Sequence, residues 1–122
     1  MAISLTHGLQ DSGERVTFDT GAQKEPVQVD KGRYDLIPPE PLHRLAVVYA
    51  RGAEKYDANN WRKGVPLSRL VDSAFRHLNQ WRNGMRDEDH LAQCSWQIFA
   101  LMYTTAAIER GELPKELNDI AS

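Results

Sequence analysis

Two histidines, His77 and His90, have the residue type and spacing most suggestive of a shared site. Apolar residues recur at helical spacing before the first and after the second, and residues 82–87 between them indicate a turn. The two helices are therefore expected to be antiparallel neighbours that hold both imidazoles at one interior edge. Buried imidazoles need hydrogen-bond partners. The pair is expected either to form a satisfied network between the helices or to face a pocket and bond a ligand.

Acidic residues immediately precede the second histidine. Asp87, Glu88 and Asp89 lead into His90, and this set offers oxygen and nitrogen ligands to a divalent cation. Acids are also common in the first turn of a helix, where they interact favourably with the helix dipole. Both interpretations, a metal site and a helix start, remain open. Glu54 is a further acid near the end of an earlier predicted helix.

Basic residues are more numerous than their local surroundings require. Lys31 and Arg33 flank a glycine, which lets the backbone approach a ligand closely, so this segment is a candidate phosphate hook. Arg69 and Arg76 are two helical turns apart on one predicted face, and guanidinium forks match phosphate geometry. Alternatively, the segment with Lys31 and Arg33 only precedes a helix, and Arg69 and Arg76 lie on a solvent-exposed helix face.

Aromatic and amide side chains complete a set suited to a nucleotide. Indole and phenyl rings provide surfaces on which a base can stack, and amides can orient it, although the rings on the second helix also suit a core. The predicted ligand-binding residues are Lys31, Arg33, Asn60, Trp61, Arg69, Phe75, Arg76, His77, Trp81, His90 and Gln97.

The chain lacks the short motifs of common catalytic sites. No P-loop, GxSxG, HExxH or GxGxxG pattern is present. The single cysteine, Cys94, excludes an intramolecular disulfide and a multi-cysteine zinc site, and it is expected to be a small buried apolar residue. We favour binding of a nucleotide without cleavage and therefore expect no catalytic residue, no bound metal and no cofactor.

The N-terminal third indicates a small β element followed by a helix. Residues 14–20 alternate enough for a short strand, and residues 27–29 are predicted to pair with it. Pro38 and Pro39 mark the start of a first helix that ends near Tyr56, because proline is tolerated in the first turn.

Two more helices follow a loop at residues 57–66. Ser68 is the predicted N-cap of the second, and Asp87 is the predicted N-cap of the third, which runs to about Arg110. The third is apolar nearly all round, which favours an oligomer interface. The fold class is therefore mainly α (α+β), with three principal helices, a short N-terminal two-stranded β element and an oligomeric assembly.

Length and charge limit the organisation and the partners. The 122 residues predict one domain, 1–122, with an extended or β segment at 1–35 and a helical core at 36–122. The net charge of −2 does not favour a DNA or RNA polymer or a membrane surface. No apolar run reaches the length of a membrane span and no signal peptide is visible, so a cytoplasmic homo-oligomer is expected.

Several segments resemble a bacteriophage domain classed as the N-terminal part of dATP/dGTP diphosphohydrolases. They include "GRYDLIPPE" (32–40), "RHLNQW" (76–81) and "DEDHLAQCSWQ" (87–97), and the resemblance runs from Phe18 to about Leu101. It implies cleavage of a purine deoxynucleoside triphosphate to monophosphate and pyrophosphate, as helical MazG-type enzymes do with magnesium or manganese. In this alternative the metal-binding residues are Glu54, Asp87, Glu88 and Asp89.

The chain lacks the ExxE and ExxD ladder of MazG-type helices, since the second predicted helix offers Asp72 as its only acid. It also resembles phage proteins that block the Thoeris defence, which are oligomeric sponges for cyclic ADP-ribose variants or cyclic oligonucleotides. The favoured prediction is thus a phage-type protein, in the host cytoplasm, that sequesters a cyclic nucleotide immune signal without cleaving it. A third alternative is a structural oligomeric interaction protein.

Overall fold

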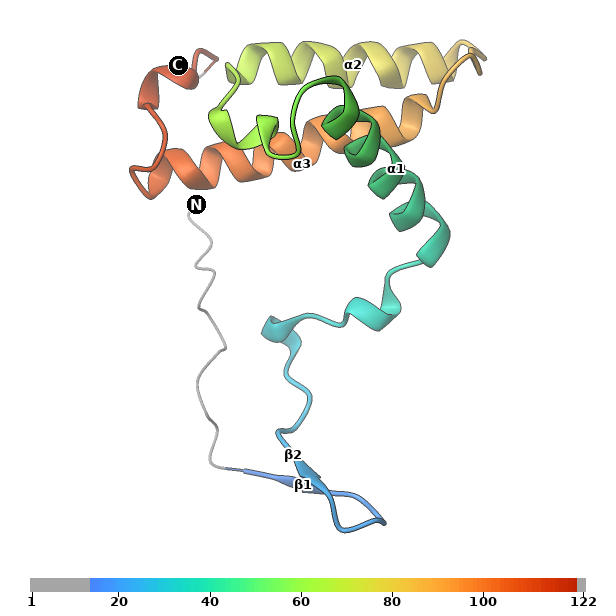
Figure 1. Cartoon of the computed structure of the whole chain (residues 1–122), viewed down its shortest axis with the longest axis vertical. Helices are drawn as coiled ribbons and strands as arrows, with labels where there is room; N and C mark the ends of the chain where they lie inside the picture. The colour runs from blue at the N-terminus through green and yellow to red at the C-terminus, as the bar shows by residue number, and fades with distance from the viewer. Residues whose placement is uncertain (1–13, 121–122) are drawn as a thin grey trace. The chain divides into compact units, whose positions relative to one another are not determined.

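The computed structural model describes residues 14–120, which fall into two compact units with the boundary between Ile37 and Pro38. The first unit contains a two-stranded antiparallel sheet, in which Val16 lies opposite Lys24 and Thr17 lies opposite Gln23 (Figure 1). Its elements are β1 (Val16–Thr17), β2 (Gln23–Lys24) and the 3-10 helices η1 (Val29–Lys31) and η2 (Tyr34–Leu36).

The predicted strand at residues 27–29 is wrong, because β2 lies earlier in the chain and Val29 begins η1. The turn is tight: the Phe18 amide donates to the Ala22 carbonyl at 2.8 Å, and Gly21 supplies the positive φ of +85° that closes it. The chain therefore reverses at once, and the sheet ends before Pro26, which has no N–H to donate.

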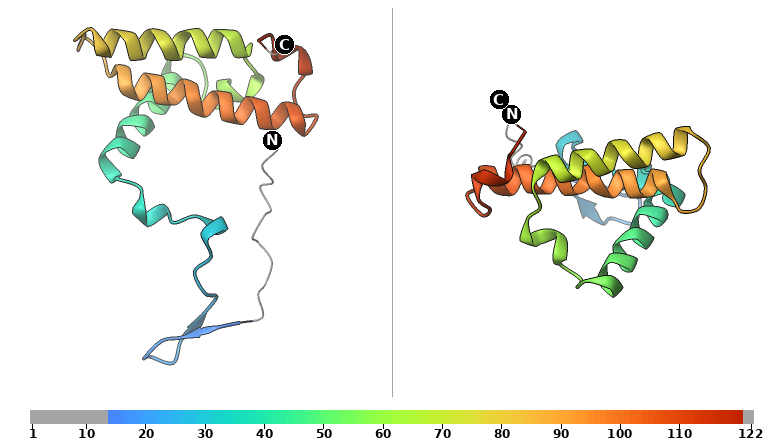
Figure 2. Two further views of the ribbon diagram at one scale, coloured as in Figure 1. Left: turned by 180° about the vertical axis from the view of Figure 1, so that it is seen from behind. Right: turned by 90° about the horizontal axis from the view of Figure 1, so that it is seen from above.

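The second unit is a three-helix fold, as predicted. α2 and α3 lie side by side and antiparallel, and α1 packs against α3 at an angle to the pair (Figures 1 and 2). The elements are α1 (Pro39–Lys55), η3 (Asn60–Lys63), α2 (Leu67–Arg82), α3 (His90–Glu109) and η4 (Lys115–Leu117). Among the helices within residues 14–120, none combines the length and apolar character needed to cross a bilayer.

In the core between α2 and α3, large side chains of α2 pack against small side chains of α3. Leu67 and Leu70 of α2 pack with Ala100 of α3, and Thr104 and Ala107 follow on the same face of α3. The spacing of the three α3 residues, four and then three, places them in one stripe. Burial of each leucine contributes about 1.5–3 kcal/mol to stability, so this contact anchors the helix pair.

Other apolar side chains of α3 remain exposed. Ile98, Phe99 and Met102 are between 46% and 60% accessible. The oligomer interface expected from this helix stays a prediction.

The start of α2 is capped from a distance, so the prediction of Ser68 as N-cap is wrong. Pro66 occupies the cap position and has no side chain that can accept a hydrogen bond. The Ser68 amide donates to Asp119 at 2.9 Å, and the Ser68 hydroxyl donates to the other carboxylate oxygen at 2.5 Å. These bonds lower the pKa of Asp119, with the hydroxyl contributing most.

Replacing Asp119 by alanine is expected to lower the melting temperature by roughly 4–8 °C at pH 7, the effect of losing a typical helix cap from a domain of this size. The folded-state pKa is lowered, so the stabilisation is present above the unfolded pKa and is lost as the pH falls through the folded value. Thermal unfolding from pH 7 to pH 3 should therefore show the two proteins converging. Asp72→Ala, at an exposed α2 position, is the matched control. A constant gap across this pH range would contradict the assignment.

The start of α3 is also displaced from its prediction. Asp89, not Asp87, is the N-cap and accepts from the Ala92 amide at 3.2 Å. Arg44 of α1 donates to both oxygens of Asp89, each at 2.7 Å. This fork links the N-terminal half of α1 to the start of α3 and lowers the pKa of Asp89. Asp87 is left free for another contact, described below.

Candidate functional site

Four aromatic rings tie α1, η3 and α3 together. Trp61 meets Tyr103 edge-on with the ring centres 4.8 Å apart, and it meets Tyr49 edge-on at 6.2 Å. Tyr49 also contacts Trp96, at 6.1 Å. Edge-to-face contacts of this kind add stability beyond the burial of the rings. They hold the short helix η3 in place although it has only four residues.

A cavity of about 420 Å³ opens beside this aromatic cluster. Its wall is formed by the C-terminal half of α1, the segment through η3, the first turns of α2 and the N-terminal half of α3. Tyr49, Trp61 and Trp96 supply ring surface, and Val48 and Leu70 supply aliphatic surface. The volume falls within the range of small-molecule sites, about 300–1,000 Å³.

Two arginines in the wall of this cavity have no acidic partner among the residues that the structure describes. Arg51 of α1 and Arg69 of α2 are both exposed and unpaired there. Other arginines of the chain are neutralised by two-pronged bonds, such as Arg44 with Asp89 and Arg110 with Glu112. The cavity therefore carries uncompensated positive charge, which suits an anionic ligand.

Amides line the same cavity, contributed by Asn60, Gln93 and Gln97. Among the described residues of the wall, Asp57 is the one acid. Its carboxylate accepts from the Lys63 ammonium at 2.6 Å and from the Asn59 amide at 3.0 Å. Lys63 lowers the pKa of Asp57, and the carboxylate serves to shape the loop.

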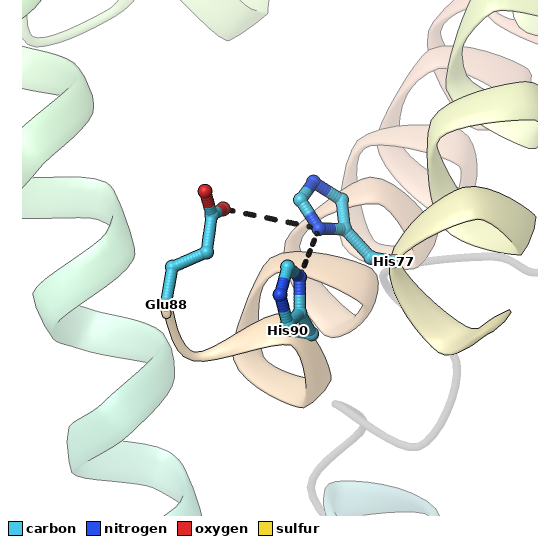
Figure 3. Close-up of side chains that lie close together, drawn as sticks. All are labelled: His77, Glu88 and His90. Atoms are coloured by element: carbon cyan, nitrogen blue, oxygen red, sulfur yellow. Dashed lines mark hydrogen bonds and ion pairs between the residues drawn. The ribbon is translucent and has the colours of Figure 1, made fainter. Parts of the chain in front are cut away.

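The two histidines meet, as predicted, at the opposite end of α2 from its cap. The Nδ1 atoms of His77 and His90 are 3.0 Å apart, and both residues are buried, His90 to 2% exposure. His90 Nε2 lies 2.8 Å from an oxygen of Asp87. Glu88 reaches over the pair, with its carboxylate 3.9 Å from His77 Nδ1 (Figure 3). Burial lowers the pKa of His77, and the bond from His90 lowers the pKa of Asp87.

A second cavity, of about 490 Å³, lies against this cluster. Asp87, Glu88 and His90 are in its wall, together with Arg86. Arg51 lines both cavities, so they adjoin along α1. The remaining wall residues are Arg44, Trp81 and Asp89.

The structure brings many of the predicted ligand-binding residues into these two places. Asn60, Trp61, Arg69 and Gln97 line the first cavity. Trp81 and His90 line the second, and His77 contacts His90. Three of the acids assigned to the enzyme alternative, Asp87, Glu88 and Asp89, also line the second cavity.

Other predicted residues lie elsewhere. Phe75 and Arg76 are exposed on α2 and line neither cavity, and Glu54 is exposed on α1 outside both. Lys31 and Arg33 belong to the first unit. There Arg33 donates to both oxygens of Asp35, at 2.8 and 2.7 Å, so its fork is already occupied.

Sequence reasoning missed Tyr49, Arg51, Gln93 and Trp96 in the first cavity. The local sequence did not mark Arg51, because a residue two positions after Tyr49 points about 200° around the helix from it. Gln93 and Trp96 lie on α3. The sequence predicts that this helix is apolar nearly all round, so it does not indicate which face borders a cavity.

The comparisons with known proteins agree with one of the resemblances. A family model described as dATP/dGTP diphosphohydrolase, N-terminal, matches residues 21–112. Neither the curated proteins nor the solved structures give a significant match. The matched range contains every wall residue of both cavities and the whole histidine cluster.

Proposed function

Because the chain belongs to the dATP/dGTP diphosphohydrolase N-terminal family, we propose that it binds a purine deoxynucleoside triphosphate and hydrolyses it to the monophosphate and pyrophosphate. The observation that carries the proposal is the first cavity. It combines aromatic rings, amides and two arginines that no described carboxylate neutralises.

Each part of a purine nucleotide has a suitable partner in this cavity. Trp61 and Trp96 offer ring surface to the base, where stacking on an aromatic side chain contributes about 1–3 kcal/mol. Gln93 and Gln97 carry both donors and acceptors, which the polar edge of a purine requires. Arg69 and Arg51 attract the phosphates.

The triphosphate would extend from the first cavity toward the second, because Arg51 borders both. There the histidines and carboxylates provide groups that can orient or deprotonate a water molecule. In the reaction, water attacks the α-phosphorus, the bond between that phosphorus and the bridging oxygen breaks, and pyrophosphate departs. The proton of the attacking water passes to a base or to solvent.

A second candidate function is sequestration of a nucleotide without cleavage, as in proteins that bind cyclic ADP-ribose variants or cyclic oligonucleotides. One observation favours it: Asp57, the one acid among the described wall residues of the first cavity, already pairs with Lys63, so this wall offers no unpaired carboxylate. A ligand confined to this cavity would be held and not cleaved.

Product analysis separates the two functions. The full chain is incubated with dATP or dGTP and Mg²⁺ or Mn²⁺, and in parallel with cyclic ADP-ribose, and the nucleotides are then analysed by chromatography. Monophosphate and pyrophosphate in equal amounts, formed over many turnovers, support hydrolysis. Intact ligand recovered only after heat denaturation supports sequestration. Neither product formation nor retention of any of these nucleotides would contradict both, and would favour a structural interaction protein.

A further inference from the structure

The proton positions in the histidine cluster leave a lone pair directed at a shared point. A carboxylate accepts hydrogen bonds and does not donate them, so the proton in the 2.8 Å contact with Asp87 is assigned to His90 Nε2. In a neutral imidazole the other nitrogen, Nδ1, then bears a lone pair. This lone pair faces His77 Nδ1, and the Glu88 carboxylate faces the same place (Figure 3).

We propose that His77, His90 and Glu88 form a binding site for a single divalent transition-metal ion. One ligand atom from each residue lies within 4.8 Å of the other two. Ligands about 2.1 Å from a tetrahedral metal are separated by about 3.4 Å. Two of the three separations, 3.0 Å between the Nδ1 atoms and 3.9 Å from His77 to Glu88, lie on either side of that value, and the third is at most 4.8 Å.

The residues around the cluster are of the same chemical types as those around the ligands of known metal sites. A ligating histidine commonly donates its other N–H to a carboxylate, which fixes its orientation, and Asp87 stands in that relation to His90. Asp87 is thus a positioning residue and not a ligand. Two imidazoles and one carboxylate suit Zn²⁺, Co²⁺, Mn²⁺ or Fe²⁺ better than Mg²⁺ or Ca²⁺, which prefer oxygen ligands alone.

Three protein ligands leave at least one coordination position open, as in catalytic zinc sites. Glu88 and His90 line the second cavity, so the open position faces it. A metal there would act as a Lewis acid on a phosphate oxygen or on water. This use of the metal rests on the proposed function, whereas the site itself rests only on the cluster geometry.

The competing explanation is a plain hydrogen bond, in which His77 Nδ1–H donates to His90 Nδ1. Metal titration of the full chain without nucleotide distinguishes the two. After treatment with a chelator, the protein is titrated with Co²⁺, monitored by its visible absorption, and with Zn²⁺, monitored by calorimetry. We expect one equivalent to bind and Zn²⁺ to displace Co²⁺. Absence of any binding of these ions would overturn the proposal.

Variants locate the ion. Glu88 is partly exposed, so Glu88→Gln should fold normally and bind Zn²⁺ at least 10-fold more weakly. Asp87→Asn should weaken binding about 10–100-fold, the usual effect of removing the orienting carboxylate. His90→Gln should abolish binding, with circular dichroism confirming its fold. Because His90 is buried, the Glu88 and Asp87 variants decide the matter if it does not fold.

Two matched controls test whether exposed glutamate or histidine side chains outside the cluster bind the ion. Glu54→Gln and His43→Gln alter an exposed glutamate and an exposed histidine on α1, and both should leave Zn²⁺ affinity unchanged. Binding that survives Glu88→Gln and Asp87→Asn, or that is lost in either control, would overturn the proposal. Nucleotide binding is measured separately, so metal affinity without nucleotide affinity would refute the proposed function and leave the metal site standing.

Discussion

Replacing Gly64 by alanine is expected to destabilise the helical unit by about 2–3 kcal/mol. The residue has a φ of +97°, which is strained for any side chain. An added Cβ would also lie 2.7 Å from a methyl carbon of Leu117 and 3.3 Å from one of Leu113. The leucine tips can shift, but only by loosening the contact between the end of η3 and the C-terminal segment. Denaturant unfolding of the variant and the parent measures the loss.

Gly84→Ala is the matched control for this prediction. Gly84 has a φ of +86°, close to that of Gly64, but an added Cβ meets nothing within 4 Å. It should therefore lose only the conformational part, about 1–2 kcal/mol. Equal losses in the two variants would show that packing against Leu113 and Leu117 contributes nothing. Since η3 carries Asn60 and Trp61, the Gly64 variant should also bind nucleotide less well than the Gly84 variant.

The helices could be predicted from the sequence because each buries one stripe against a neighbour. The apolar spacing on α2 and the short turn after it also predicted that His77 and His90 would meet, and they do. The caps were less predictable, because a cap depends on which acceptor is nearest in space. Asp119 serves α2 from 51 residues away, and the Arg44 contact from α1 orients Asp89, the N-cap of α3.

The cavity was only partly predictable, for a related reason. Trp61 and Asn60 lie in a predicted polar loop. An indole ring in such a loop has no predicted core partner, so Trp61 is a candidate for ligand binding. Arg51 lies on a helix beside many other polar residues, and nothing in its local pattern separates it from Arg76. The difference arises in the fold, since α1 crosses α3 so that Arg51 borders both cavities while Arg76 borders neither. An arginine becomes a clear candidate for ligand binding only when the structure shows that it has no acidic partner and that it lies in a cavity wall.

Replacing Arg51 by alanine is expected to weaken dGTP or dATP binding about 10–100-fold, because a charged hydrogen bond contributes roughly 1.5–3 kcal/mol. The side chain is exposed and unpaired among the described residues, so its loss should not disturb the fold. If Arg51 contacts phosphate, the affinity for the matching deoxynucleoside, which has no phosphate, should change less than twofold. Calorimetric titration with the triphosphate and with the nucleoside gives both values.

Arg76→Ala is the control that separates the cavity from positive charge in general. Arg76 is also an exposed helical arginine, and within residues 14–120 its guanidinium donates a 3.4 Å hydrogen bond to the Ser73 hydroxyl. Both substitutions remove one positive charge, so a long-range electrostatic effect on a triphosphate would weaken binding in both and would fade at high salt. A direct contact would appear in the Arg51 variant alone and would persist at high salt. Equal losses in the two variants, or equal losses for nucleoside and triphosphate, would contradict the placement of the phosphates at the junction of the two cavities.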